Sequence, residues 1–467
     1  MKLTTANPID NRSRRVEMRG AVLVIVIWIV FGMVSMTLYF AHSMSMEMRA
    51  GANRVASLEA DQAIEGAARY ISCVLSNLTT PGTMPDLSTY QNEAVPVGDA
   101  HFWLIGRNWN SQDSPTIPHF GLIDEASKLN LNFTPSNALS MIPRMQVDVL
   151  ANLLAWRSTN TSNLSGGAES DTYQRNSPPY LCKNAPLETV DELRLVYNMD
   201  FESLYGEDAN LNGILDANEN DGDTTAPSDN RDGILDCGIL EYSTVYTHEP
   251  TKMTNGTTAR YNIATFINPT GRAALISALT NGTTITASRA AAIYTQATAG
   301  RAASATPPFT SPLQFYVAAK MTVAEIGSVE YNLRGNNVQG LVNVNTASEA
   351  VLACIPGLTN GQAATLTAYR AQNTNNLNGS IGWVTQAGLQ TSDITSAGPY
   401  LTGKTYQYMA DIAAIGHDGR GYRRVRFVFD LAQGGAPIIR YRQDLTHLGW
   451  ALGKEARDKW VMAKGTP

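Results

Sequence analysis

The longest apolar run of the chain lies close to its N-terminus. No charged residue occurs between Ala21 and Ala41, and a helix of about 21 residues rises ~31 Å, roughly the thickness of a bilayer's hydrocarbon core. The next segment, 47–78, has no proline and repeats its apolar residues at the helical period. This pattern predicts one helix over residues 21–80, in which the first half spans a membrane and the second half packs on a soluble domain.

Strand-like patterns occur in two groups that are far apart in the sequence. The first group contains 101–105 and 120–132, and the second contains 406–415, 422–430 and 438–444. The segment 120–132 alternates well enough for a hairpin or a bent strand, and turn residues separate the last three segments, as in an antiparallel meander. We expect residues 81–132 and 401–450 to form one antiparallel sheet.

The region between the two strand groups, 133–400, has a helical pattern with many loops. A short apolar helix is expected at 147–156, and another after Thr189, which has the spacing of a capping box with Glu192. The expected fold class is therefore α+β. It combines an N-terminal transmembrane and stalk helix with an antiparallel sheet and a large inserted α-helical domain.

Residues 340–372 predict a helix-hairpin-helix inside this insertion. Thr346 and Glu349 have the spacing of a capping box for the first helix, and Ile355–Leu358 (IPGL) makes the turn to the second. DNA-binding hairpins hold a phosphate with backbone amides, but Thr359 replaces their second glycine and no basic patch surrounds it. We therefore expect a structural or protein-contact role without nucleic acid.

Composition and charge exclude several classes of function. With 467 residues, of which 43% are hydrophobic, the chain can form two or three domains with their own cores. A net charge of −6 gives no basic face for nucleic acid. The six histidines show no HExxH spacing, and no P-loop, GxGxxG or G-x-S-x-G sequence occurs, so an enzyme is not expected. Residues 251–312, rich in Thr, Ala, Asn and Gly, predict no function.

Four cysteines, Cys73, Cys182, Cys237 and Cys354, are spread over the chain without a C-x-x-C pair. In an oxidising compartment four cysteines can form up to two disulfides. A bridge between Cys182 and Cys237 is one alternative, and four buried free thiols are the other.

Residues 208–219, DANLNGILDANE, match the calcium-loop pattern D-x-[DN]-x-[DN]-G-x5-E at every fixed position. Gly213 makes the turn, and the expected ligands are Asp208, Asn210, Asn212, the carbonyl of Ile214, Asp216 and Glu219. All of them are hard oxygen donors, which suit Ca²⁺. A solvated acidic loop is the alternative.

A weaker copy of this pattern follows within the predicted calcium-binding region, 205–241. Its candidate ligands are Asp229, Asn230, Asp232 and Asp236 around Gly233, with Asp221 and Asp223 as further contributors. The twelfth position is Ile239, which has no side-chain oxygen, and the next acid is Glu241. A second calcium site and a simple Gly-Asp turn are both open interpretations.

The segment before the apolar run is basic and ends in a glycine. Four arginines lie between residues 12 and 19, Gly20 follows, and the apolar run begins at Ala21. A secretory signal has a shorter apolar region followed by small residues, whereas cleavage after Gly20 keeps the anchor on the mature protein. Positive charge before the span predicts a cytoplasmic N-terminus and an exported remainder.

This arrangement resembles the class III leaders of type IV pilins and pseudopilins. The resemblance implies that residues 1–20 form a leader, that a prepilin peptidase cleaves between Gly20 and Ala21, and that Ala21 becomes methylated. The mature fifth position is Glu in most of these proteins and is Ile25 here. That departure is typical of the K type of pseudopilin in type II secretion systems.

Further segments are similar to the K-type minor pseudopilin family, in the family's order. They are GLIDEASKLNLN at 121–132, a helix ending near Trp156, a PPY segment at 178–180, PLETVDELRLV at 186–196, and the helix-hairpin-helix. The resemblance implies a pilin-like sheet, an inner-membrane anchor and a periplasmic C-terminal domain. It also implies a non-enzymatic subunit that caps the tip of the type II secretion pseudopilus. Such a subunit helps I- and J-type minor pseudopilins to start assembly of the major pseudopilin, for protein export across the outer membrane.

Two other classes share some of these features. A calcium-binding minor pilin or adhesin of a type IV pilus has the same kind of leader and metal loop, and a DNA-uptake receptor uses a helix-hairpin-helix. The sequence names no secreted substrate.

Overall fold

The computed structural model describes residues 19–107, 116–159, 166–253, 256–265, 269–300, 309–374, 377 and 379–462. The chain divides into two compact units, Met1–Val55 and Ala56–Pro467. Helix α1 begins at Arg19 and ends at Ser76, so the predicted leader before Arg19 lies outside the described residues. The segment Val22–Ser76 is long and apolar enough to cross a membrane. An N-terminal apolar helix is therefore confirmed, and the cleavage site between Gly20 and Ala21 stays a prediction.

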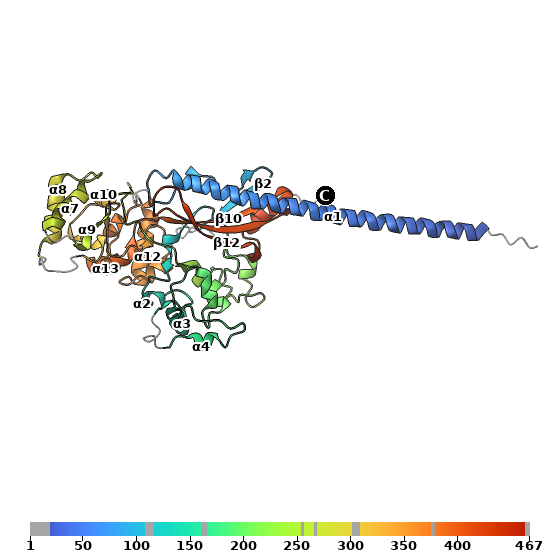
Figure 1. Cartoon of the computed structure of the whole chain (residues 1–467), viewed down its shortest axis with the longest axis horizontal. Helices are drawn as coiled ribbons and strands as arrows, with labels where there is room; N and C mark the ends of the chain where they lie inside the picture. The colour runs from blue at the N-terminus through green and yellow to red at the C-terminus, as the bar shows by residue number, and fades with distance from the viewer. Residues whose placement is uncertain are drawn as a thin grey trace, which may run out of the picture. The chain divides into compact units, whose positions relative to one another are not determined.

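The sheet of the second unit joins strands from distant parts of the sequence (Figure 1). Its strands are β1 (Val95–Val97), β2 (Ala100–Ile105), β3 (Ile123–Asp124), β10 (Gln407–Ile415), β11 (Arg423–Asp430) and β12 (Ile438–Asp444). Their order is β1-β2-β10-β11-β12, and every pair is antiparallel. β3 continues along the same edge of β10 as β2 and pairs with Tyr408 and Met409. The α+β class, with an antiparallel sheet, is confirmed.

The part of α1 that follows Ala56 covers one face of this sheet. Small side chains allow a close approach: Ala60 and Ala63 are fully buried and belong to one apolar cluster with Phe427 of β11. Gly421, just before β11, has a φ of +70°, and a Cβ there would lie 2.3 Å from the carbonyl carbon of Ala56. Glycine is required at this position because any side chain would separate the helix from the sheet.

The segment predicted as a hairpin or bent strand at 120–132 is bent. β3 ends at Asp124, the 3-10 helix η2 (Glu125–Ser127) follows, and β4 (Leu129–Asn130) pairs in parallel with β5 (Ser243–Thr244). Two more short parallel pairs lie in the second unit: β6 (Tyr261–Asn262) with β7 (Leu333–Arg334), and β8 (Val342–Asn343) with β9 (Leu401–Thr402).

Short helices joined by loops occur throughout the region between β4 and β9. They are α2 (Ser136–Leu139), α3 (Val147–Arg157), α4 (Ser170–Tyr173), α5 (Phe201–Tyr205), α6 (Ile239–Tyr242), α7 (Pro269–Thr280), α8 (Ala287–Thr298), α9 (Pro312–Ala318), α10 (Val323–Val329), α11 (Glu349–Ala353), α12 (Asn360–Gln372) and α13 (Thr391–Ala397). The predicted capping box of Thr189 and Glu192 is present, but it starts a 3-10 helix, η4 (Val190–Leu195). Helix α14 (Gly453–Arg457) follows β12 and is itself followed by the π-helix η12 (Asp458–Met462).

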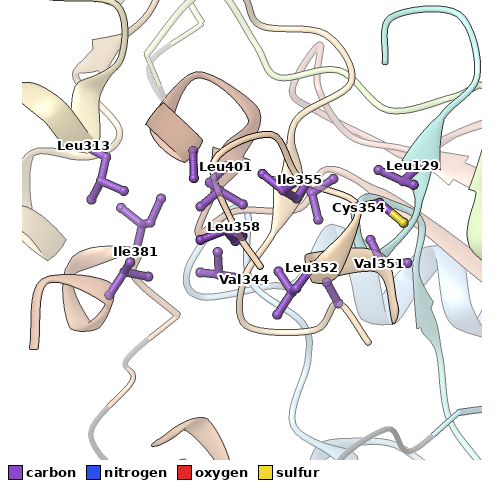
Figure 2. Close-up of a cluster of buried hydrophobic side chains, with 14 of the residues drawn as sticks. Leu129, Leu313, Val344, Val351, Leu352, Cys354, Ile355, Leu358, Ile381 and Leu401 are labelled. Atoms are coloured by element: carbon purple, nitrogen blue, oxygen red, sulfur yellow. The ribbon is translucent and has the colours of Figure 1, made fainter. Parts of the chain in front are cut away.

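Helices α11 and α12 are joined by the Ile355–Leu358 turn and share one buried core. Figure 2 shows Val351, Leu352, Ile355 and Leu358 in this cluster, together with residues from other elements such as Leu129 and Leu401. Both helices are present where the sequence placed them. Their assignment as a helix-hairpin-helix stays a prediction.

The predicted capping box of Thr346 and Glu349 is wrong. The N-cap of α11 is Ser348, whose hydroxyl accepts a hydrogen bond from the N–H of Val351. The Thr346 hydroxyl instead donates to the buried carboxylate of Asp124 at 2.5 Å. A buried carboxylate is removed from water and needs hydrogen-bond donors, so Asp124 binds the Thr346 hydroxyl. The next residue with a side-chain oxygen, Ser348, then caps the helix.

Of the two alternatives for the cysteines, the disulfide between Cys182 and Cys237 is not formed, and all four cysteines are free. The Cys182 sulfur lies 4.0 Å from the carbonyl oxygen of Ala155 on α3, whereas the Cys237 sulfur lies 4.0 Å from that of Leu235. Each thiol is thus packed against a different segment. Three of the four are buried, but Cys73 on α1 is exposed.

A fully buried ion pair lies at the centre of the sheet. Asp411 of β10 accepts two hydrogen bonds of 2.8 Å from Arg424 of β11 and one of 2.9 Å from Arg426. Burial alone raises the pKa of Asp411, but the charges of the two arginines outweigh it and hold the pKa well below its usual value. The carboxylate is therefore ionised and paired in the folded state.

We predict that Asp411→Asn lowers the unfolding free energy by about 3–5 kcal/mol, because it leaves Arg424 buried without its counter-charge. The control is Asp61→Asn, which breaks an ion pair with Arg423 whose aspartate and arginine side chains are 47% and 34% exposed. This control should cost less than about 1 kcal/mol. Denaturant unfolding of both variants measures the difference, and equal losses would contradict the prediction.

Candidate metal centre

The predicted calcium loop begins three residues after the end of α5 and is closed by its own side chains. Asp208 is fully buried, and its two carboxylate oxygens accept hydrogen bonds from the N–H groups of Asn212 at 2.9 Å and Gly213 at 2.8 Å. Gly213 has a φ of +71°, which glycine adopts without strain. The turn at the sixth position is therefore made as the sequence pattern requires.

Two asparagines form the middle of the loop. The Oδ1 of Asn210 accepts from the N–H of Asn212 at 3.0 Å, and the Oδ1 of Asn212 accepts from that of Ile214 at 2.7 Å. Both side-chain amides donate to the same carboxylate oxygen of Asp216, at 2.8 and 3.0 Å. The asparagines thus bring Asp216 to the first half of the loop.

Glu219 closes the loop from its other end. It is the last residue of the 3-10 helix η5 (Ala217–Glu219), and its carboxylate accepts from the N–H groups of Ala209 at 3.0 Å and Asp216 at 3.1 Å. The structure therefore gathers Asp208, Asn210, Asn212, Asp216 and Glu219 in one compact loop. Ile214 lies in the same turn with a buried side chain.

The acidic side chains of the loop are crowded. Burial, opposed by the charge of Arg107, raises the pKa of Asp208 to about 6. Burial and then the nearby charges of Asp208 and Asp216 raise the pKa of Glu219 to about 8. Three carboxylates in a low-dielectric loop repel each other, and a divalent cation relieves that repulsion.

Among the described residues, no group of three or more His, Cys, Asp or Glu side chains has the spacing to hold a metal ion. A calcium loop differs from such clusters because amide and backbone oxygens supply part of its ligands. Here Asn210, Asn212 and the Ile214 carbonyl are the candidates for that part. The donor set of the loop, hard oxygens with three carboxylates, fits Ca²⁺.

Two buried arginines hold the backbone of the loop against the sheet. Arg107, which follows β2, donates to the carbonyl oxygens of Asn212 at 2.9 Å and Leu211 at 3.0 Å. Arg424 of β11 donates to those of Asn210 and Leu211. The loop is therefore positioned by the sheet and not only by its own residues.

Sequence reasoning missed these arginines as part of the site. Glu241 was noted only as an acid beyond the second loop, but its carboxylate pairs with Arg107 at 2.8 Å, and both side chains are buried. One signal was present in the sequence: Asp411 is the single charge within the otherwise uncharged strand 406–415. A buried acid in a strand requires a partner, and Arg424 is that partner.

The second predicted loop is looser and more exposed. Asp229 accepts hydrogen bonds from the N–H groups of Asp221 and Gly222, and the amide of Asn230 donates to Asp232 at 3.0 Å. Asp236 is exposed, and its N–H donates to the Glu207 carboxylate at 3.1 Å. The structure thus joins Asn230 with Asp232, and Asp229 with the 221–222 turn.

Comparison with known proteins identifies one part of the chain. Residues 137–205 match the family model of type II secretion system (T2SS) protein K. This segment contains α2, α3, α4, η4 and α5 and ends three residues before the calcium loop. No curated protein matches the chain.

A solved structure is also similar in part. It is a chain in the crystal structure of the GspK-GspI-GspJ complex from the enterotoxigenic Escherichia coli type 2 secretion system, with 11% sequence identity and a TM-score of 0.35. The match covers 86% of this chain and 98% of that chain. At this TM-score the likeness carries no argument about fold or function.

The family match covers one segment on which the sequence resemblance was based, including PLETVDELRLV at 186–196. Residues 137–205 therefore form a domain of the type II secretion system protein K family, as the resemblance indicated.

Proposed function

We propose that this chain is a non-enzymatic K-type minor pseudopilin that caps the tip of a type II secretion pseudopilus. The observation that carries the proposal is the protein K domain at 137–205. It lies between strands of the antiparallel sheet, and the sheet is preceded by an apolar helix long enough to span a membrane. In this proposal α1 anchors the protein in the inner membrane, and residues after the span lie in the periplasm.

The capping role is supported by the size and place of the insertion. The chain leaves the sheet after β3 and returns to it at β10, so the whole helical region is one insertion between these two strands of a pilin-like body. A subunit stacked above it along the filament axis would clash sterically with this helical region. Ile25, in place of the glutamate usual in pilins, fits a position with no further subunit beyond it.

The proposed partners are the I- and J-type minor pseudopilins, which would pack on the exposed side of α1 and with this chain start assembly of the major pseudopilin. Leu58 and Gln62 are exposed on α1 within the second unit, whereas Ala63 faces the sheet and is fully buried. This difference separates the free face of the helix from its packed face.

The loop 208–219 would bind Ca²⁺ and stabilise the helical region. Asp208, Asn210, Asn212, Asp216, Glu219 and the Ile214 carbonyl would hold the ion, whose charge compensates the crowded carboxylates. Because the loop carbonyls are bound by Arg107 and Arg424, stabilising the loop also stabilises its junction with the sheet.

The first prediction of this proposal concerns processing. Cleavage after Gly20 by a prepilin peptidase should leave Ala21 as a methylated N-terminus. Mass spectrometry of the protein purified from membranes detects this peptide. An intact leader, or cleavage beyond the apolar run, would contradict the prediction.

The second prediction concerns calcium. The melting temperature of the wild-type chain should rise with calcium, because an ion bound only to the folded state stabilises it by about 2.7 kcal/mol at 100 times its Kd. Glu219→Gln should lose this response. In chelator, however, it should be at least as stable as the wild type, because the repulsion from Asp208 and Asp216 is reduced. The control Glu202→Gln removes an exposed acid of α5 and should keep the full response.

If Glu219→Gln only removes a calcium ligand, its melting temperature is below that of the wild type with calcium but not in chelator. If it misfolds, its melting temperature is lower under both conditions. Asp232→Asn tests the second loop and should leave the main calcium response in place. A wild-type melting curve that is the same in calcium and chelator would overturn the calcium assignment and leave the capping proposal intact.

The third prediction concerns position in the filament. In a Cys73→Ser background, cysteines at Leu58 and Gln62 should cross-link to the I- and J-type partners, while a cysteine at the buried Ala63 should not. About one copy per pseudopilus is expected. Cross-links along the shaft, at a stoichiometry similar to the major subunit, would refute the cap.

A further inference from the structure

A cavity of about 130 Å³ opens in the helical region, away from the calcium loop. Its wall is made by the start of α9, by residues 335–337 after β7, and by residues 398–404 around β9. Its mouth lies where three lining residues are exposed: Thr310, two residues before α9, and Asn336 and Asn337 after β7. The interior is therefore accessible from solvent.

Two ion pairs line the cavity, and their charges balance. An Nη of Arg260 lies 2.7 Å from the Glu249 carboxylate, and the Nζ of Lys404 lies 3.3 Å from that of Glu330. All four side chains are at most 10% exposed. A charged guest would place an uncompensated charge in this wall, which is costly in a buried site. The cavity therefore favours a neutral guest.

One hydrogen-bond donor in the wall has no partner among the described residues. The Nη atoms of Arg260 donate to Glu249 and to backbone carbonyls, but its Nε is buried without an acceptor. In Glu330, Oε1 accepts from the N–H of Ile381 at 2.6 Å, whereas the contact of Oε2 is the ion pair with Lys404 at 3.3 Å. A buried unsatisfied donor costs about 1–3 kcal/mol, so Arg260 favours a guest that supplies an acceptor, and a carboxylate oxygen can accept more than one hydrogen bond.

One part of the remaining wall is apolar. Leu313, Ile381 and Leu401 line the cavity and belong to the buried cluster of Figure 2. We propose that this cavity binds a peptide amide that carries a small aliphatic side chain. The amide C=O accepts from Arg260, its N–H donates to Glu330, and the side chain packs on the three apolar residues. A cavity of roughly 150 Å³ holds benzene, so an isobutyl side chain fits the available space.

The test uses the full-length chain in detergent micelles and N-acetyl-L-leucinamide as the probe. This neutral amide should raise the melting temperature in a concentration-dependent way. N-acetyl-L-leucine, which carries a carboxylate at neutral pH, should bind at least about tenfold more weakly because its charge must be desolvated. No effect of the amide, as for a cavity that holds ordered water only, or equal binding of both compounds, overturns the proposal.

A matched pair of variants locates the binding site. A Cβ at Gly335 would lie 3.4 Å from Pro312 and 3.7 Å from the Thr310 oxygen, so Gly335→Leu places its bulk at the cavity mouth. Gly361 on α12 has no atom within 4 Å of its Cβ position, so Gly361→Leu adds the same bulk to open space. Gly335→Leu should lose the response to the amide and Gly361→Leu should keep it. Unchanged binding in Gly335→Leu overturns the site.

A second measurement decides the matter if Gly335→Leu does not fold. The wild-type chain is irradiated with an N-acetyl leucinamide that carries a diazirine on its side chain, and the labelled peptides are identified by mass spectrometry. Labels should fall on the residues that line the cavity: 249, 260, 310–316, 330–341, 381 or 398–404. Labelling elsewhere, or none that excess N-acetyl-L-leucinamide competes away, refutes the proposal. Because none of these residues is a calcium-loop or α1 residue, the result is independent of the capping role.

Discussion

The buried pair of Asp411 and Arg424 connects three segments of the second unit that are far apart in the sequence. Arg424 of β11 binds the carboxylate of β10, and its other N–H groups donate to the backbone of residues 210 and 211. A sheet normally contacts a neighbouring layer through apolar side chains. Here a charged side chain crosses that boundary, and any replacement leaves buried carbonyls or a buried charge without a partner.

This connection has a direct consequence for the acidic loop. Its backbone is held by Arg107 and Arg424, whereas its carboxylates repel each other when ionised. The hydrogen bonds of the loop hold its carboxylates close together, although their negative charges repel each other. A bound cation would offset this repulsion. The raised pKa of Glu219 has the same origin, because burial and two neighbouring acids disfavour its charged form.

Local sequence patterns predicted the elements well where one periodicity continues over several residues. The meander of β10, β11 and β12 was placed within one residue at each boundary, because glycine-rich turns separate the three strand-like runs. β1 was not predicted, since it has three residues with a proline at the centre. Helix capping was less predictable. Thr346 has the spacing of an N-cap, but its hydroxyl donates a hydrogen bond to the buried carboxylate of Asp124, which lies on a distant strand.

The sequence alone determined the apolar helix, the α+β class and the spacing of the calcium-loop residues, because each depends on neighbours within about a dozen positions. It also carried the segments that identify the protein K domain. Only the tertiary structure decided which charges are buried together, that the cysteines are apart, and that Arg107, Glu241 and Arg424 support the loop. The reason is that pairing in a buried environment depends on which distant segments meet, and desolvation then makes those partners obligatory.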